Sequence, residues 1–148
     1  MKTASAPSTG KITRLLIISL LLVFGLAGRP WAAEKAQLEI LYMNHGPMRP
    51  TLVRIRELLQ DFPHAFEIHW YDFDTPAAGK FMKRRRLSGH IPLLILLNGR
   101  SDFDVNGRRV QLRGFPTGAA PFKKVEGNWS FGDLRLIFEQ NTAPAGGR

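Results

Sequence analysis

The chain has 148 residues, and none of them is cysteine. This absence excludes a disulfide-stapled scaffold, a thiolate metal site, a cysteine nucleophile and the attachment of a lipid anchor to a cysteine. Acidic residues are also scarce, at 12 against 21 Lys and Arg. Four of those basic residues fall within the first 33 positions, which leaves a mildly basic domain that suits an anionic surrounding.

The first 33 residues have the layout of an export signal. Lys2, Lys11 and Arg14 precede an apolar run at 15–28 that is short for a membrane span. The cleavage site is imperfect, so both a cleaved signal peptide and a retained N-terminal membrane anchor remain open. Either reading predicts an exported protein, periplasmic or held at the outer face of the inner membrane, for which no nucleic-acid partner is expected.

The remaining pattern predicts one α/β domain over residues 36–140, followed by a disordered tail over 141–148. Apolar spacing that alternates between periods of two and 3.6 predicts the order β-α-β-α-β-β-α. The expected elements are strands at 38–43, 66–73, 93–97, 103–105 and 109–112, and helices at 47–61, 76–87 and 131–140.

Local signals support several of these elements. Short β-α-β-α connections indicate parallel strands with helical crossovers. Asn106-Gly107 is a hairpin signal, so we expect antiparallel strands to close the sheet. Ser130 with Asp133 three residues later resembles a capping box. The Gly- and Pro-rich stretch 114–128 is expected to form an ordered loop, and the sequence assigns it no role.

The turn after the first strand is the part of the domain where chemistry is expected. Gly46 gives this turn backbone freedom, and Pro47 presets φ for the first helical position. The start of a helix favours anions and lowers nearby pKa values. The side chains presented there are those of His45 and Met48, which are not the nucleophiles that this geometry usually serves.

Two motifs in this order resemble those of the thioredoxin-like superfamily. Asn44-His45-Gly46-Pro47-Met48-Arg49-Pro50 keeps the Gly-Pro of that family's active-site turn, with His45 and Met48 where its two cysteines would stand. Gly89-His90-Ile91-Pro92, leading into an apolar strand and Asn98-Gly99, is similar to the family's cis-proline loop.

The resemblance implies a minimal thioredoxin-like fold with a mixed central sheet flanked by helices. It also implies a cis Ile91–Pro92 bond packed against the His45–Met48 turn. Glu39, six residues before His45, stands where thioredoxins carry a buried carboxylate that assists proton transfer.

Thiol–disulfide exchange requires an attacking thiolate, which neither imidazole nor thioether can replace. We therefore expect no catalysis of this class, as in a degenerate relative of an oxidoreductase. The favoured interpretation is a module that binds a polypeptide or an envelope protein by strand addition. Ile91 would supply main-chain contacts, and Tyr42, His45 and Phe115 would form walls, unless Tyr42 and Phe115 are packing residues.

Two alternatives remain. His45 and Met48, with His90 near in the expected fold, could bind Cu(I), because imidazole and thioether suit that ion. No other cofactor is expected. His45 could instead act as a general base oriented by Glu39, although the expected strand geometry disfavours their contact.

Overall fold

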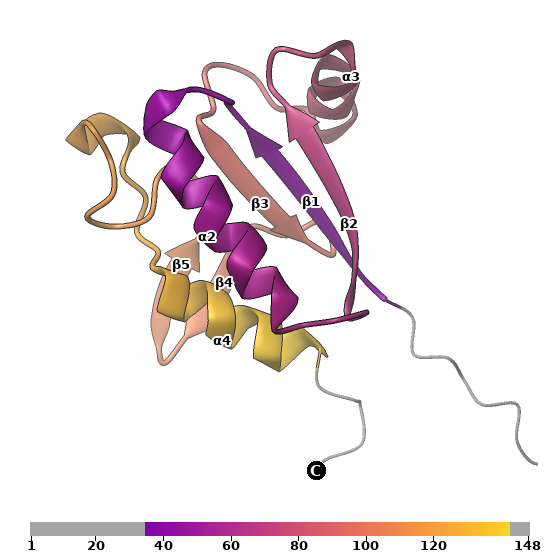
Figure 1. The fold of residues 1–148 in the computed structure, drawn as a ribbon, viewed down its shortest axis with the longest axis vertical. Coiled ribbons are helices and arrows are strands. Elements are labelled where there is room, and N and C mark those ends of the chain that lie inside the picture. The colour runs from indigo at the N-terminus through magenta and orange to yellow at the C-terminus, as the bar shows by residue number, and fades with distance from the viewer. Residues whose placement is uncertain (1–34, 143–148) are drawn as a thin grey trace, which may run out of the picture. The chain divides into compact units, whose positions relative to one another are not determined.

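The computed structural model describes residues 35–142 (Figure 1). The expected leader at 1–33 and residues 143–148 of the expected tail lie outside this range. Within it, no helix is long and apolar enough to cross a membrane. The elements are β1 (Ala36–Tyr42), η1 (Gly46–Met48), α2 (Arg49–Gln60), β2 (Phe66–Asp72), α3 (Pro76–Arg85), β3 (Leu93–Leu97), β4 (Asp102–Val105), β5 (Arg108–Gln111), η2 (Lys123–Val125) and α4 (Phe131–Thr142).

The central sheet is mixed and has three strands in the order β2-β1-β3. β1 runs parallel to β2, with Ile40 opposite Trp70, and antiparallel to β3, with Ile40 opposite Ile95. The expected α/β class, the parallel pairing of the first two strands and the flanking helices are therefore confirmed. β1 is the central strand, which explains why apolar residues occupy both of its faces.

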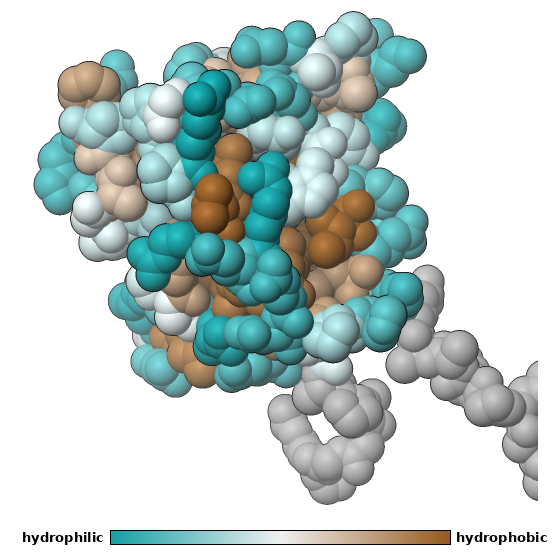
Figure 2. Space-filling model, in the orientation of Figure 1, coloured by the Kyte–Doolittle hydropathy of each residue, from teal (hydrophilic) through white to brown (hydrophobic). Residues whose placement is uncertain are grey.

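Alternate residues of the sheet enter two separate cores. Leu38 and Ile40 pack with Ile55 of α2 and Ile137 of α4, whereas Leu41 packs with Phe81 of α3. α2 and α4 thus cover one face of the sheet and α3 covers the other (Figure 1). The exposed surface over α2 and α4 is mainly hydrophilic, and its apolar areas are broken up by polar side chains (Figure 2).

The expected hairpin is present, but it closes the sheet differently from the prediction. Asn106 and Gly107 have φ angles of 53° and 75°, as a type I′ turn requires. β4 and β5 form their own two-stranded sheet. The chain bends after β5, where the Arg113 N–H donates to the Gln111 carbonyl at 2.8 Å. Only the continuation at 112–114 then pairs with β3, through Ile95 N to Leu112 O at 3.0 Å and Gly114 N to Leu93 O at 2.8 Å.

The helix starts and ends follow local chemistry. The first helix begins as the 3₁₀ turn η1, because Pro50 has no N–H to donate to Gly46 in an α-helical bond. The capping box is confirmed, since Ser130 N donates to Asp133 Oδ2 at 2.7 Å and Asp133 N donates to Ser130 Oγ at 3.1 Å. The last helix continues through Thr142, two residues past its expected end at 140. Asn141 and Thr142 extend the helix, and their side chains bond the carbonyls of Ile137 and Phe138.

The predicted cis Ile91–Pro92 bond is wrong, because no cis peptide occurs within residues 35–142. The trans form is the favoured state of an X–Pro bond. The trans connection still ties this loop to the end of β1, since the Met43 N–H donates to the Pro92 carbonyl at 3.0 Å.

Candidate functional site

The turn between β1 and α2 presents one of its two expected functional side chains and buries the other. His45 is exposed at the N-cap of η1, and its side chain makes no capping hydrogen bond. Met48 is fully buried in the core that α2 and α4 share with the sheet. The two side chains therefore lie in different environments, and the Met48 sulfur is occupied by packing.

A metal site receives no geometric support from these residues. Within the described range, no group of three or more His, Asp or Glu side chains could hold an ion. His90 is exposed, with its ring centroid 6.1 Å from that of Phe73. Met48 is enclosed by the core whereas His45 is exposed, and Cu(I) binding by this pair stays a prediction.

Glu39 is a buried carboxylate with a partner of its own. It is 7% exposed and forms an ion pair with Arg85 at the end of α3. Leu41, two residues later on the same face of β1, belongs to the core under α3, whereas Met48 lies in the core under α2. Glu39 and Met48 are thus on opposite sides of the sheet, and the arrangement of Glu39 as an orienting group for His45 is not formed.

Two of the residues expected to hold a peptide are parts of the core. Ile91 is fully buried against Leu41 and Phe81, and Phe115 is buried in the α2–α4 core. The backbone of Ile91 is therefore not open to an added strand. Tyr42 is half-buried and meets the Trp70 ring edge-on, with centroids 5.8 Å apart.

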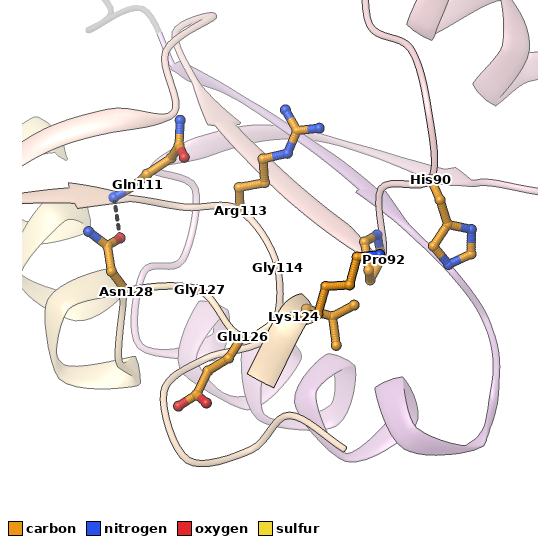
Figure 3. A pocket seen from close by; sticks show the side chains of 10 residues that line it. His90, Pro92, Gln111, Arg113, Gly114, Lys124, Glu126, Gly127 and Asn128 are labelled. Carbon is orange, nitrogen blue, oxygen red and sulfur yellow. Dashed lines mark hydrogen bonds between the residues drawn. The ribbon is translucent and has the colours of Figure 1, made fainter. Parts of the chain in front are cut away.

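A pocket of about 610 Å³ lies beside Pro92 (Figure 3). It is bounded by the start of β3, by the strand segment at 111–114 and by the loop segment at 124–128. His90 and Pro92 lie on one side of it, with Gln111 and Asn128 across from them (Figure 3). Its lining residues are His90, Pro92, Gln111, Arg113, Gly114, Lys124, Val125, Glu126, Gly127 and Asn128.

Two glycines let the loop approach the strand closely enough to form this wall. A Cβ on Gly114, which has φ 75°, would lie 2.6 Å from the Val125 carbonyl oxygen. A Cβ on Gly127 would clash with the Arg113 carbonyl oxygen and lie 3.0 Å from that of Phe115. The close approach is used for hydrogen bonds, from Phe115 N to Val125 O at 2.9 Å and from Gly127 N to Phe115 O at 2.7 Å.

Side chains at 128–129 hold the same loop from its other end. The fully buried Trp129 donates its Nε1–H to the Gly114 carbonyl at 3.1 Å. Asn128 accepts from Gln111 N at 2.8 Å and donates to the Arg109 carbonyl at 3.0 Å. Sequence reasoning gave this loop no role, although Trp129, a large apolar residue at the end of a Gly- and Pro-rich stretch, was a signal that the loop is anchored.

Some of the charged side chains around the pocket have a partner of opposite charge and others do not. Glu126 accepts from Lys123 Nζ at 2.7 Å and from Gly118 N at 2.8 Å. These bonds, that of Lys123 first, hold the pKa of the Glu126 carboxyl below its ordinary value. The exposed side chains of Arg113 and Lys124 make no ion pair within residues 35–142. The pocket therefore carries two free cationic groups beside one carboxylate that is already engaged.

No family model, no curated protein and no solved structure matches this chain.

Proposed function

We propose that this chain is an exported thioredoxin-like protein without redox chemistry, which binds a polypeptide of the cell envelope in the pocket beside Pro92. The export-signal layout of residues 1–33 supports its placement in the envelope. The binding surface differs from the one that the sequence suggested, because Ile91 is buried and the pocket is open.

The arrangement of the elements supports the thioredoxin-like assignment. A parallel β1–β2 pair with an intervening helix is joined through antiparallel β3 to the segment at 112–114. One helix covers one face of the sheet and two helices cover the other. The end of β1, just before the turn at 45–48, is tied to the proline loop by the Met43–Pro92 hydrogen bond.

The observation that carries the proposed function is the pocket at Pro92. In the thioredoxin-like superfamily, the surface beside the equivalent proline holds an extended peptide. Here a volume of about 610 Å³ adjoins this proline, within the range of ligand-binding pockets. Its lining combines apolar Pro92 and Val125 with the polar groups of Gln111, Arg113 and Lys124, a mixture that suits a polypeptide.

Chemistry on the bound polypeptide is not part of the proposal. Thiol–disulfide exchange needs a thiolate, and the chain contains no cysteine. His45 is exposed and Met48 is buried in the core, and neither an imidazole nor a thioether can replace the thiolate. We expect the chain to give no insulin reduction above buffer, and measurable turnover would refute the non-redox assignment.

The test uses the full chain in a non-ionic detergent, which keeps the apolar N-terminal run in solution. Peptides selected from a random displayed library would be titrated into the ¹⁵N-labelled chain, and backbone shifts would be mapped. We expect the largest changes at 90–93, 111–114 and 124–128. Gln111→Trp should block binding, because the indole would occupy the pocket from an exposed position.

Gln60→Trp is the matched control for Gln111→Trp. Gln60 is also exposed but ends α2, a helix that contributes no residue to the pocket. The Gln60→Trp variant should bind the selected peptides as tightly as the parent chain does. Failure to select any peptide, or equal binding by both Trp variants, would overturn the proposed function.

A further inference from the structure

We infer that the pocket beside Pro92 recognises a carboxylate of its polypeptide ligand, with Arg113 as the specificity-determining residue. This inference rests on the proposed function and adds the chemical class of the recognised group. The carboxylate can belong to an Asp or Glu side chain or to a C-terminus, and the experiment below distinguishes these sources.

Arg113 differs from the other arginines of the same stretch in having no acidic partner. Arg108 pairs with Asp133 at 2.7 Å, and Arg109 pairs with Asp102 at 3.2 Å. Within residues 35–142, the Arg113 guanidinium has no ion pair and no side-chain hydrogen bond, and it stacks on no ring. The fold thus neutralises two of these three cations and leaves free the one that lines the pocket.

The neighbouring pocket groups cannot neutralise Arg113. Glu126 already accepts bonds from Lys123 and Gly118, and in Figure 3 its side chain extends away from Arg113. Asn128 is committed to the backbone of Gln111 and Arg109. Arg113 extends from the strand on the opposite side of the pocket from the Glu126 carboxylate (Figure 3).

The charge of the lining favours an anionic ligand. Arg113 and Lys124 supply two positive charges, and the one carboxylate of the lining, that of Glu126, is paired with Lys123 outside the lining. The pocket therefore has an excess of positive charge, with which a carboxylate would pair. The guanidinium offers parallel N–H donors that match the two oxygens of a carboxylate, and charge-assisted pairs of this kind are among the stronger hydrogen bonds.

Apolar groups next to these cations favour a carboxylate that is carried by a chain. Pro92 and Val125 line the same pocket as Arg113 and Lys124. They offer contact to the methylene groups or the neighbouring residues of a peptide, whereas a free inorganic anion would gain nothing from them.

The experiment measures binding of fluorescent heptapeptide pools to the full chain in the same detergent. The pools are random except at the central position, which is fixed as Glu or as Gln, and each is made with a free and with an amidated C-terminus. We expect the best carboxylate-bearing pool to bind about tenfold more tightly than the amidated Gln pool, which has no fixed carboxylate. Preference for Glu regardless of amidation identifies a side-chain carboxylate, and preference for the free C-terminus identifies the terminal one.

The variants assign this preference to Arg113. Arg113→Gln should remove the preference, and Arg113→Lys should retain part of it, because the charge remains but the paired donors are lost. Arg49→Gln is the matched control, since Arg49 is exposed and lies outside the pocket lining. Unchanged thermal unfolding would confirm that each variant is folded.

The outcomes separate the inference from the proposed function. If all four pools bind equally, or if Arg113→Gln keeps the preference, carboxylate recognition is refuted while peptide binding stands. If no pool binds the parent chain, both are refuted.

Discussion

Replacing Gly127 by Ala tests whether the loop at 115–128 is pinned against the strand as closely as the structure indicates. The new Cβ would clash with the Arg113 carbonyl oxygen and lie 2.8 Å from Trp129 Cδ1 and 3.0 Å from the Phe115 carbonyl oxygen. Ordinary contacts between such atoms are about 3.5 Å or longer. Two of the three obstacles are backbone atoms, so a side-chain rotation cannot relieve the overlap.

The expected cost has two parts. Forcing an extra methyl group into a packed site costs about 1–3 kcal/mol. Moving Gly127 away also weakens its 2.7 Å hydrogen bond to the Phe115 carbonyl, which contributes about 1 kcal/mol. We therefore expect Gly127→Ala to lower the free energy of unfolding by about 2–4 kcal/mol and to weaken peptide binding, because Gly127 also lines the pocket.

The same substitution at Gly79 should have the opposite sign. Gly79 is exposed within α3, and a Cβ added there would meet no heavy atom within 4 Å. Ala in a helix interior is favoured over Gly by about 0.5–1 kcal/mol. Urea unfolding followed by tryptophan fluorescence, to which the buried Trp129 contributes, would measure both variants. If Gly127→Ala is as stable as the parent, the described attachment of the loop, and with it the pocket wall, is wrong.

Three further experiments test packing and charge. Met48→Ala should lower the free energy of unfolding by about 2–5 kcal/mol because Met48 is fully buried. Met48→Leu should lower it by less than about 1.5 kcal/mol, because the volume is nearly conserved. Equal effects of the two substitutions in urea unfolding would contradict a role of Met48 in the core. Burial alone raises the pKa of Asp133, but hydrogen bonds from Ser130 and Arg108 outweigh it and hold the pKa below 3.8. The Asp133 carboxylate therefore stabilises the fold above pH 3.8, so Asp133→Asn should lower the free energy of unfolding by about 1 kcal/mol at pH 7. This difference between variant and parent should vanish as the pH falls through and below 3.8. A difference that does not depend on pH would count against the ionic cap. Arg85→Met should lower the thermal stability of the fold, because it leaves the buried Glu39 carboxylate unpaired. Adding Glu39→Gln to this variant should restore part of the lost stability. If the two substitutions instead destabilise additively in thermal unfolding, the pairing is rejected.

The parts of the fold that follow from local rules could be predicted from the sequence. Alternation along β1 sends Ile40 to one core and Leu41 to the other, because successive strand residues point to opposite faces. Asn106-Gly107 forms the expected turn because both residues tolerate positive φ. Ser130 and Asp133 cap α4 because their spacing alone brings the bonding atoms together.

The candidate site could not be predicted, because it depends on contacts between distant residues. Spacing placed His45 and Met48 on one turn, but the direction of the Met48 side chain is set by the core it enters. The pocket wall forms because Gly114 and Gly127, thirteen positions apart, allow two backbone segments to meet. The sequence signals a flexible stretch at such residues and does not identify the segment that each one approaches.

The burial of Met48 bears on where the proposed binding surface lies. A turn that acts on a ligand must present its groups to that ligand, yet of the two side chains expected to act here Met48 fills the core and His45 is exposed. The proline loop is linked to the end of β1, just before this turn, through the Met43–Pro92 hydrogen bond, and Pro92 also lines the pocket that includes Arg113 and Lys124. Recognition can therefore depend on the side of the loop that faces the long 115–128 segment. The 115–128 segment, to which the sequence assigned no role, thus supplies half of the residues that line the proposed binding site.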